Sequence, residues 1–184
     1  MGSDVGEKDE RPEHLVKLQD NFLFSRTEVT HKQYKACVNA GDCSSPAIGN
    51  GCVWGTADSE ELPINCVNWK QANEFAQFVG LRLPTEAEWE YVASSGDERR
   101  YPWGNDEPTC DFMVLQSCTQ LAQPVCESEA VPRLDQIPTQ RFPICDLVGN
   151  VAEWVEDNYS TSYVGASQTG IPFVTTNRRL KHYR

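Results

Sequence analysis

Eight cysteines constrain the fold of this 184-residue chain more than any other feature of its sequence. They form two groups of four: Cys37, Cys43, Cys52 and Cys66, followed by Cys110, Cys118, Cys126 and Cys145. An even number of cysteines in loop-rich segments predicts disulfides, which form in oxidising compartments; reduced cysteines in the cytosol are the alternative. Because the grouping favours bridges within each set, we expect the pairs 37–66, 43–52, 110–118 and 126–145.

The overall charge limits the classes of partner. The chain carries a formal net charge of −11, with 27 acidic against 16 basic residues. Such a surface repels phosphate backbones and anionic lipid, so nucleic-acid and membrane-surface roles are disfavoured and cations are favoured. No apolar run in the sequence is long enough to span a membrane. Only three histidines and no Cys-x-x-Cys pair occur, which gives a zinc site little support.

Three capping boxes predict where three helices begin. In this motif two side chains, three positions apart, satisfy backbone N–H groups that the first turn of a helix leaves without partners. The boxes are Thr30 with Gln33, Asn68 with Gln71, and Thr85 with Glu88. Gly41 and Gly80 are expected to end the first two helices. The buried face predicted for the second helix consists of Trp69, Ala72, Phe75, Ala76 and Val79.

The acidic residues of the third predicted helix have structural roles that explain them without catalysis. Glu88 closes the capping box and Glu86 lies near the positive end of the helix, where a negative charge is stabilising. Trp89 and Val92 are expected to face inward. We therefore interpret Glu86, Glu88 and Glu90 as structural, and we assign no catalytic residue.

Strands are expected near the amino terminus, and loops farther along the chain. Apolar, partly alternating runs at 15–18 and 22–29 predict two strands. From Ser94 onward, glycine, proline, aspartate and cysteine are frequent enough to exclude long helices before Cys145. Short helices, strands and long loops together indicate an α+β domain.

Two segments carry a resemblance to a known family. Residues 82–91 read Arg-Leu-Pro-Thr-Glu-Ala-Glu-Trp-Glu-Tyr, and residues 149–154 read Gly-Asn-Val-Ala-Glu-Trp. With Glu28-Val29-Thr30 and the Tyr-Pro-Trp-Gly-Asn turn at 101–105, they resemble the formylglycine-generating, or sulfatase-modifying, enzyme family. The likeness covers residues 1–159, and residues 160–184 form an atypical carboxyl-terminal segment with a basic end. It implies an irregular α+β fold related to C-type lectins, with little regular secondary structure and with disulfides.

The segment 146–153 is the best candidate for a metal site. Asp146 and Glu153 are two hard carboxylates that flank a glycine-containing turn, and calcium accepts mixed carboxylate and carbonyl ligands. The resemblance implies a structural calcium held by these two side chains and by the carbonyl groups of Gly149 and Val151. The alternative is a turn in which Asp146 or Asn150 bonds its own backbone. A second calcium site of the family would fall near Asp111 and Phe112, where the sequence departs from the pattern.

The resemblance also defines what active enzymes of the family need. They carry two cysteines near the carboxyl end that bind copper(I), which prefers soft thiolate ligands, and use oxygen to oxidise a sulfatase cysteine. This sequence has no cysteine beyond Cys145, so the carboxyl-terminal catalytic part of the family is missing from it. We therefore expect a binding or interaction module without oxidase activity. The alternative is a fragment of an active enzyme, in which a longer natural chain supplies the cysteine pair and with it the copper.

The expected partners and location follow from these features. Disulfides predict a secreted or periplasmic protein. Met1 matches an internal methionine of the family's amino-terminal motif, so a signal peptide can precede this segment in the natural gene product. A protein or peptide is the favoured ligand and a glycan the weaker one, whereas nucleic acid and a membrane span are not expected.

Overall fold

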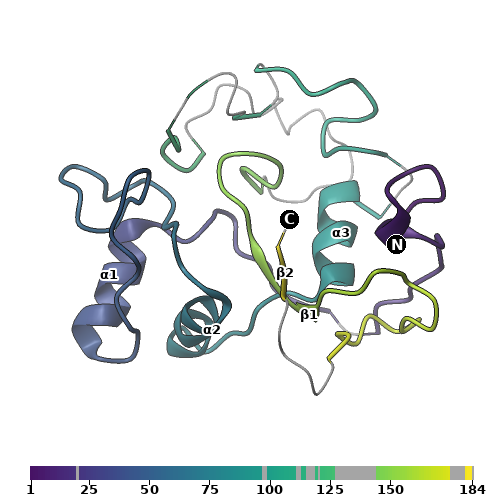
Figure 1. Cartoon of the computed structure of the whole chain (residues 1–184), viewed down its shortest axis with the longest axis horizontal. Coiled ribbons are helices and arrows are strands. Elements are labelled where there is room, and N and C mark those ends of the chain that lie inside the picture. The colour runs from purple at the N-terminus through teal and green to yellow at the C-terminus, as the bar shows by residue number, and fades with distance from the viewer. Residues whose placement is uncertain are drawn as a thin grey trace. The chain divides into compact units, whose positions relative to one another are not determined.

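The chain divides into two compact units, and each is described by itself. The computed structural model describes residues 1–19, 21–96, 99–110, 113–114, 119, 121–126 and 144–174, and the backbone of 181–183. The first unit contains Met1–Phe24, Leu83–Asp97 and Glu153–Arg184, and the second contains Ser25–Arg82 and Glu98–Ala152. Long loops connect few regular elements (Figure 1). This irregular α+β arrangement confirms the fold class that the sequence predicts.

Two capped helices form the second unit's regular structure. Helix α1 spans His31–Ala40 and helix α2 spans Trp69–Phe78, and both begin with the complete predicted capping box. Helix α1 ends where Gly41 adopts a left-handed conformation with φ of 85°, which a residue without a Cβ atom does at little cost. Local side-chain hydrogen bonds thus set both helix starts before any tertiary contact is needed.

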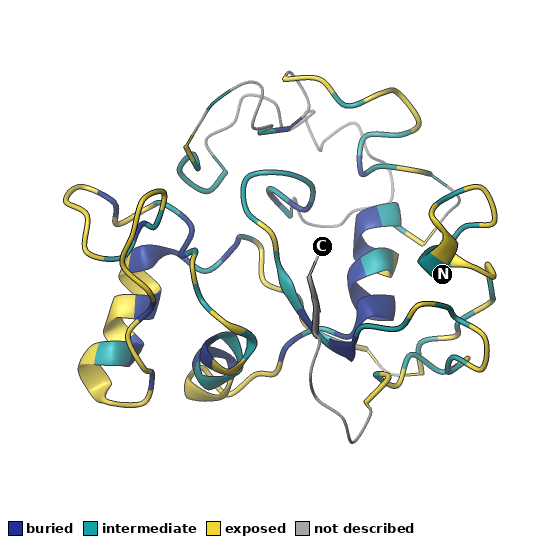
Figure 2. Cartoon of the chain, viewed as in Figure 1, coloured by how far each residue is buried: buried dark blue, intermediate teal, exposed yellow. Residues whose placement is uncertain are grey.

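An aromatic cluster fills the core between these helices. Its buried members are Tyr34, Cys37, Cys43, Ile64 and Phe75. The rings of Tyr34 and Phe75 stack with centroids 5.8 Å apart, and the Tyr34 hydroxyl donates a hydrogen bond to the Ser44 carbonyl at 3.0 Å. Burial raises the pKa of Tyr34 to about 12. Only the face of α1 that carries this cluster is buried (Figure 2).

The buried face predicted for α2 is confirmed in part, since Trp69 and Ala72 are only half-buried. Phe75 and Ala76 are buried, but Val79 is 45% exposed. Val79 is the residue that caps the helix, and the chain turns away at Gly80, so its side chain has left the face that packs. Helical periodicity ends with the helix.

In the first group of four cysteines, each disulfide joins neighbouring cysteines across a turn, instead of enclosing one predicted pair within the other. The bridge 126–145 is confirmed, whereas the pairs 37–66 and 43–52 are wrong, because the observed bridges are 37–43 and 52–66. The turn at Gly41 returns the chain so that the Cα atoms of Cys37 and Cys43 lie 5.3 Å apart. The Asn65 side chain bonds both Gly51 and Val53, which brings Cys66 to Cys52. Cys110 is also bonded, and its predicted partner Cys118 lies outside the described residues.

A helix and a strand form the core of the first unit. Helix α3 spans Glu86–Ser94, and its predicted capping box is present. Strand β1, Trp154–Asn158, pairs antiparallel with β2, Lys181–Tyr183, with an irregularity in the register. Trp89 and Ala93 of α3 pack against Val155 of β1, with Phe24 alongside. A short 3-10 helix, η1, spans Lys8–Glu10.

The two strands predicted near the amino terminus do not form among the described residues. Segments 15–18 and 22–29 are irregular, and single hydrogen bonds, such as the one from the Lys17 N–H to the Gln168 carbonyl, replace a ladder. Leu15 and Leu23 are exposed, whereas Val16, Leu18, Phe22 and Phe24 are half-buried, so the side chains alternate in burial although the described backbone forms no ladder. Across the described part of the chain, no helix is long and apolar enough to cross a membrane.

Candidate functional site

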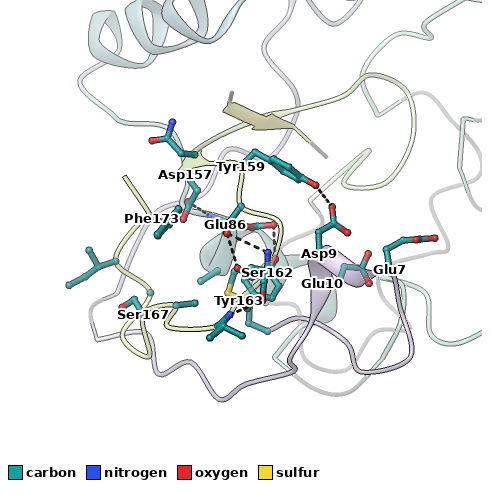
Figure 3. A pocket seen from close by; sticks show the side chains of 18 residues that line it. Glu7, Asp9, Glu10, Glu86, Asp157, Tyr159, Ser162, Tyr163, Ser167 and Phe173 are labelled. Atoms are coloured by element: carbon teal, nitrogen blue, oxygen red, sulfur yellow. Dashed lines mark hydrogen bonds between the residues drawn. The ribbon is translucent and has the colours of Figure 1, made fainter. Parts of the chain in front are cut away.

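A cavity of about 230 Å³ lies in the first unit (Figure 3). Three parts of that unit line it: the region of η1, the start of α3, and the end of β1 with the loop that follows. They contribute five carboxylates, namely Glu7, Asp9, Glu10, Glu86 and Asp157. Among the described residues that line the cavity, none is a lysine or arginine. The cavity therefore has a negative electrostatic potential.

Asp157 is the most constrained of these acids. It is 6% exposed, at the end of β1. One carboxylate oxygen accepts the Glu86 N–H at 2.7 Å and the other accepts the Phe173 N–H at 2.7 Å. Burial raises its pKa despite these bonds, and the neighbouring Glu86 carboxylate adds to the rise. Asp157 thus ties the start of α3 to the loop that forms one wall of the cavity.

Two tyrosines hold two further carboxylates in place. The Tyr163 hydroxyl donates to Oε1 of Glu86 at 2.8 Å, and the Tyr159 hydroxyl donates to Oδ2 of Asp9 at 2.8 Å. The bond to Asp9 raises the pKa of Tyr159. These residues point toward one another in the close view (Figure 3). These bonds fix the positions of two of the carboxylates that line the cavity.

The wall of the cavity is partly apolar. Val164 is 80% exposed and Ile171 is 65% exposed, and both line the cavity together with Phe173. Exposed apolar side chains gathered around a concave polar site are typical of a binding surface. The arrangement suits a cation that carries, or is flanked by, apolar groups.

The turn in which a calcium site is predicted contains residues in the left-handed conformation. Asp146 and Gly149 have φ values of 57° and 100°. A Cβ atom on Gly149 would lie 2.6 Å from the Val114 carbonyl oxygen, so only glycine fits this close approach. Oδ2 of Asp146 accepts the Cys126 N–H at 2.8 Å, rather than bonding only within its own turn.

Glu153, Asp111 and Phe112 are the other residues named in the metal predictions. Glu153 belongs to the first unit, where its carboxylate accepts the indole N–H of Trp89. Within the described residues, no group of three or more His, Cys, Asp or Glu side chains is placed to hold a metal ion. The predicted calcium set contains two carboxylates, so it depends on carbonyl oxygens. Asp111 and Phe112, near the second predicted site, lie outside the described residues.

Glu28 contacts the turn in which the calcium site is predicted, and the sequence analysis did not identify it. It is 7% exposed, and its carboxylate accepts the Val151 N–H at 3.2 Å and the Asn150 side-chain amide at 2.8 Å. The signal that could have found it is an acidic residue inside the apolar run at 22–29, directly before the helix cap Thr30. An acid in such a position needs a buried donor.

The described cysteines and His31 are held in structural interactions. None of these described cysteines is free, since all are in disulfides. His31 follows the cap Thr30 and is buried, with Nδ1 2.6 Å from the Ser59 hydroxyl oxygen.

The raised pKa of Asp157 predicts a specific pH dependence. Its contribution to the unfolding free energy is full below its ordinary pKa of 3.8 and is lost as the pH rises through the higher folded value. Relative to the non-titrating variant Asp157→Asn, wild-type stability should therefore decrease as the pH rises above the ordinary pKa of 3.8. Urea unfolding measures it, with the exposed Glu60→Gln as control. A relative stability that increases with pH would show that the two N–H bonds outweigh burial.

Comparisons with known proteins confirm the resemblance found in the sequence. PvdO from Pseudomonas aeruginosa has a similar structure, with a TM-score of 0.79 and 25% identity, covering 100% of this chain and 76% of that one. The formylglycine-generating enzyme of Mycobacterium tuberculosis is 34% identical over 108 residues, which are 56% of this chain and 36% of that protein. The inactive C-alpha-formylglycine-generating enzyme 2 of Bos taurus is 32% identical over 111 residues, or 59% of this chain and 37% of that protein.

These matches differ in how much of each protein they include. The chain spans little more than a third of the length of the two enzyme relatives, although the structural likeness to PvdO extends over the whole of it. The model of the family described as "Sulfatase-modifying factor enzyme 1-like domain" matches residues 1–182. With nearly the whole sequence inside that match, the chain belongs to the family of sulfatase-modifying factor enzyme 1-like domains.

Proposed function

We propose that this domain is a calcium-stabilised binding module that holds a cationic side chain of a protein or peptide in its acid-lined cavity. The observation that carries the proposal is the cavity itself: its described lining residues include five carboxylates and no lysine or arginine, and its rim is apolar. A cation entering it relieves the repulsion among these acids, and the low local dielectric strengthens the attraction.

The size of the cavity decides between classes of ligand. Sites for drug-sized small molecules measure about 300 to 1,000 Å³, whereas this one measures about 230 Å³. It suits one side chain of a larger partner, with the neighbouring residues of that partner lying on Val164 and Ile171. A glycan is the weaker candidate, because the hydroxyls of Tyr159 and Tyr163 already bond Asp9 and Glu86.

The first prediction of this function concerns charge recognition. A peptide with the sequence acetyl-Gly-Leu-Arg-Leu-Gly-amide should bind, and the same peptide with neutral citrulline in place of arginine should not. Glu7→Gln combined with Glu10→Gln should weaken binding by about tenfold, or about 1.4 kcal/mol. Isothermal titration calorimetry at low salt measures both effects.

A matched control separates the cavity from general electrostatics. Glu60→Gln combined with Glu107→Gln removes the same charge from exposed acids of the second unit, and binding should not change. Equal binding of the two peptides, or equal losses in the two double variants, would refute a role for the cavity.

The calcium part of the proposal concerns Asp146, Gly149, Val151 and Glu153. An all-oxygen set of two carboxylates and two backbone carbonyls fits calcium, which accepts irregular geometry. The left-handed conformations of Asp146 and Gly149 support it, since they curl the backbone tightly around a short turn. When bound, the ion would supply a fixed positive charge that crosslinks the segment.

Calcium should raise stability by mass action if only the folded chain binds it. At a free concentration a hundred times the dissociation constant, the free energy of unfolding should increase by about 2.7 kcal/mol. Thermal melts with calcium and with a chelator measure this, and Asp146→Ala should abolish the shift while Asp106→Asn, an exposed acid, should keep it. Equal melting temperatures of the wild type at all calcium concentrations would remove the site.

The proposal also holds that this chain does not perform oxidase chemistry. Copper(I) needs thiolates, and the described cysteines are in disulfides. The alternative, an active copper-dependent and oxygen-using formylglycine-generating enzyme of which this is one part, is supported by the small share of its relatives' length that the chain covers. The disulfides also favour an oxidising location, secreted or periplasmic.

Absence of turnover is the expected result for this chain alone. Incubated with copper(I), oxygen and a peptide containing Cys-x-Pro-x-Arg, the folded protein should leave the peptide's cysteine unchanged by mass spectrometry. Thiol titration of the same sample should find no reactive thiol. Conversion of the peptide cysteine to an aldehyde, lost in Cys126→Ala, would contradict the non-catalytic proposal.

A further inference from the structure

We infer that Glu28 is a positioning residue for the calcium turn at 146–151, acting on the backbone that presents the carbonyl ligands without contacting the ion. The inference rests on the calcium site proposed above. It adds a residue that is 122 positions from the turn in sequence and that the metal-ligand pattern does not contain.

The carboxylate of Glu28 holds two successive residues of the turn. Oε1 accepts the Val151 N–H at 3.2 Å, and Oε2 accepts the side-chain amide of Asn150 at 2.8 Å. Because Glu28 is buried, these charge-assisted bonds are weakly screened by water. One side chain therefore fixes both the backbone and the side chain of the turn.

Because the peptide group is planar, a hydrogen bond that fixes an N–H group also fixes the direction of the preceding carbonyl group. In a trans peptide the N–H and the preceding C=O point in opposite directions. The Asn150 N–H donates to the Val114 carbonyl at 3.0 Å, so the Gly149 carbonyl points away from Val114. The Val151 N–H is fixed by Glu28 in the same way, which sets the orientation of the peptide group between the two proposed ligand carbonyls, those of Gly149 and Val151.

The same network reaches the carboxylate ligand Asp146. The Asn150 side chain accepts the Gln123 N–H at 2.9 Å and donates to the Gln123 carbonyl at 3.1 Å. Three residues later the Cys126 N–H donates to Oδ2 of Asp146 at 2.8 Å, and Cys126 is disulfide-bonded to Cys145. Glu28 is thus connected through Asn150 and one short segment to the side chain of Asp146.

Only an ionised acid of this length satisfies both donors. A glutamine at position 28 offers one acceptor oxygen, and its NH2 group would face another donor. An aspartate keeps the charge but is shorter by one methylene and does not reach both partners. The two substitutions therefore separate charge from position.

Calcium titration by calorimetry tests the inference directly, with the metal ion alone as the probe. Glu28→Gln and Glu28→Asp should each lower calcium affinity by about 10- to 100-fold, the range for residues that orient metal ligands. Glu74→Gln is the matched control, because Glu74 also accepts one backbone N–H and one side-chain donor, both from Ser44 of the same unit. It should lower stability and leave calcium affinity unchanged.

Each outcome decides a separate point. Unchanged affinity in Glu28→Gln, with calcium bound by the wild type, would overturn the role of Glu28 alone. Affinity lost in Glu28→Gln but kept in Glu28→Asp would mean that charge acts without positioning and would also overturn it, as would equal losses in Glu74→Gln. If neither Glu28 variant folds, Asn150→Ala must lower affinity, and no calcium binding by the wild type would remove the proposed site itself together with this inference.

Discussion

Buried carboxylates that accept backbone N–H groups hold the loops of this protein in place. A chain with few helices and strands leaves many amide groups without a partner in a ladder, and burying them without an acceptor would be costly. Glu28 accepts from Val151, while Asp157 accepts from Glu86 and Phe173. In each case one acid provides an acceptor for backbone amides that no sheet pairs, and joins segments distant in sequence.

Because of this role, part of the acidic composition belongs to the interior and not to the charged surface. A net charge of −11 describes a surface that repels anions, yet Glu28, Glu86, Glu88 and Asp157 are buried. In the first unit, Glu86 and Asp157 both hold the fold together and line the cavity. The proposed binding site therefore shares Asp157 with the scaffold, since this acid satisfies two backbone amides and also contributes to the negative concave surface.

Local features of the sequence were sufficient for the helices and for the family. Capping boxes depend on residues three positions apart, so Thr30, Asn68 and Thr85 marked the three helix starts correctly. The pairing of Cys37 with Cys43 depends on the turn at Gly41, and the pairing of Cys52 with Cys66 depends on the bonds of Asn65. The spacing of the cysteines does not encode either feature. The acceptor role of Glu28 depends on a contact across 122 residues, and no local pattern contains it.

Hydrogen exchange of three amides, measured by NMR, tests the central claim most directly. The N–H groups of Val151, Glu86 and Phe173 donate to buried carboxylates, although Val151 and Phe173 lie outside helices and strands and Glu86 is in the unpaired first turn of α3. The account predicts that all three exchange far more slowly than in the unfolded chain, and that Val151 loses protection in Glu28→Gln. Exchange at unfolded-chain rates in the wild type would contradict it.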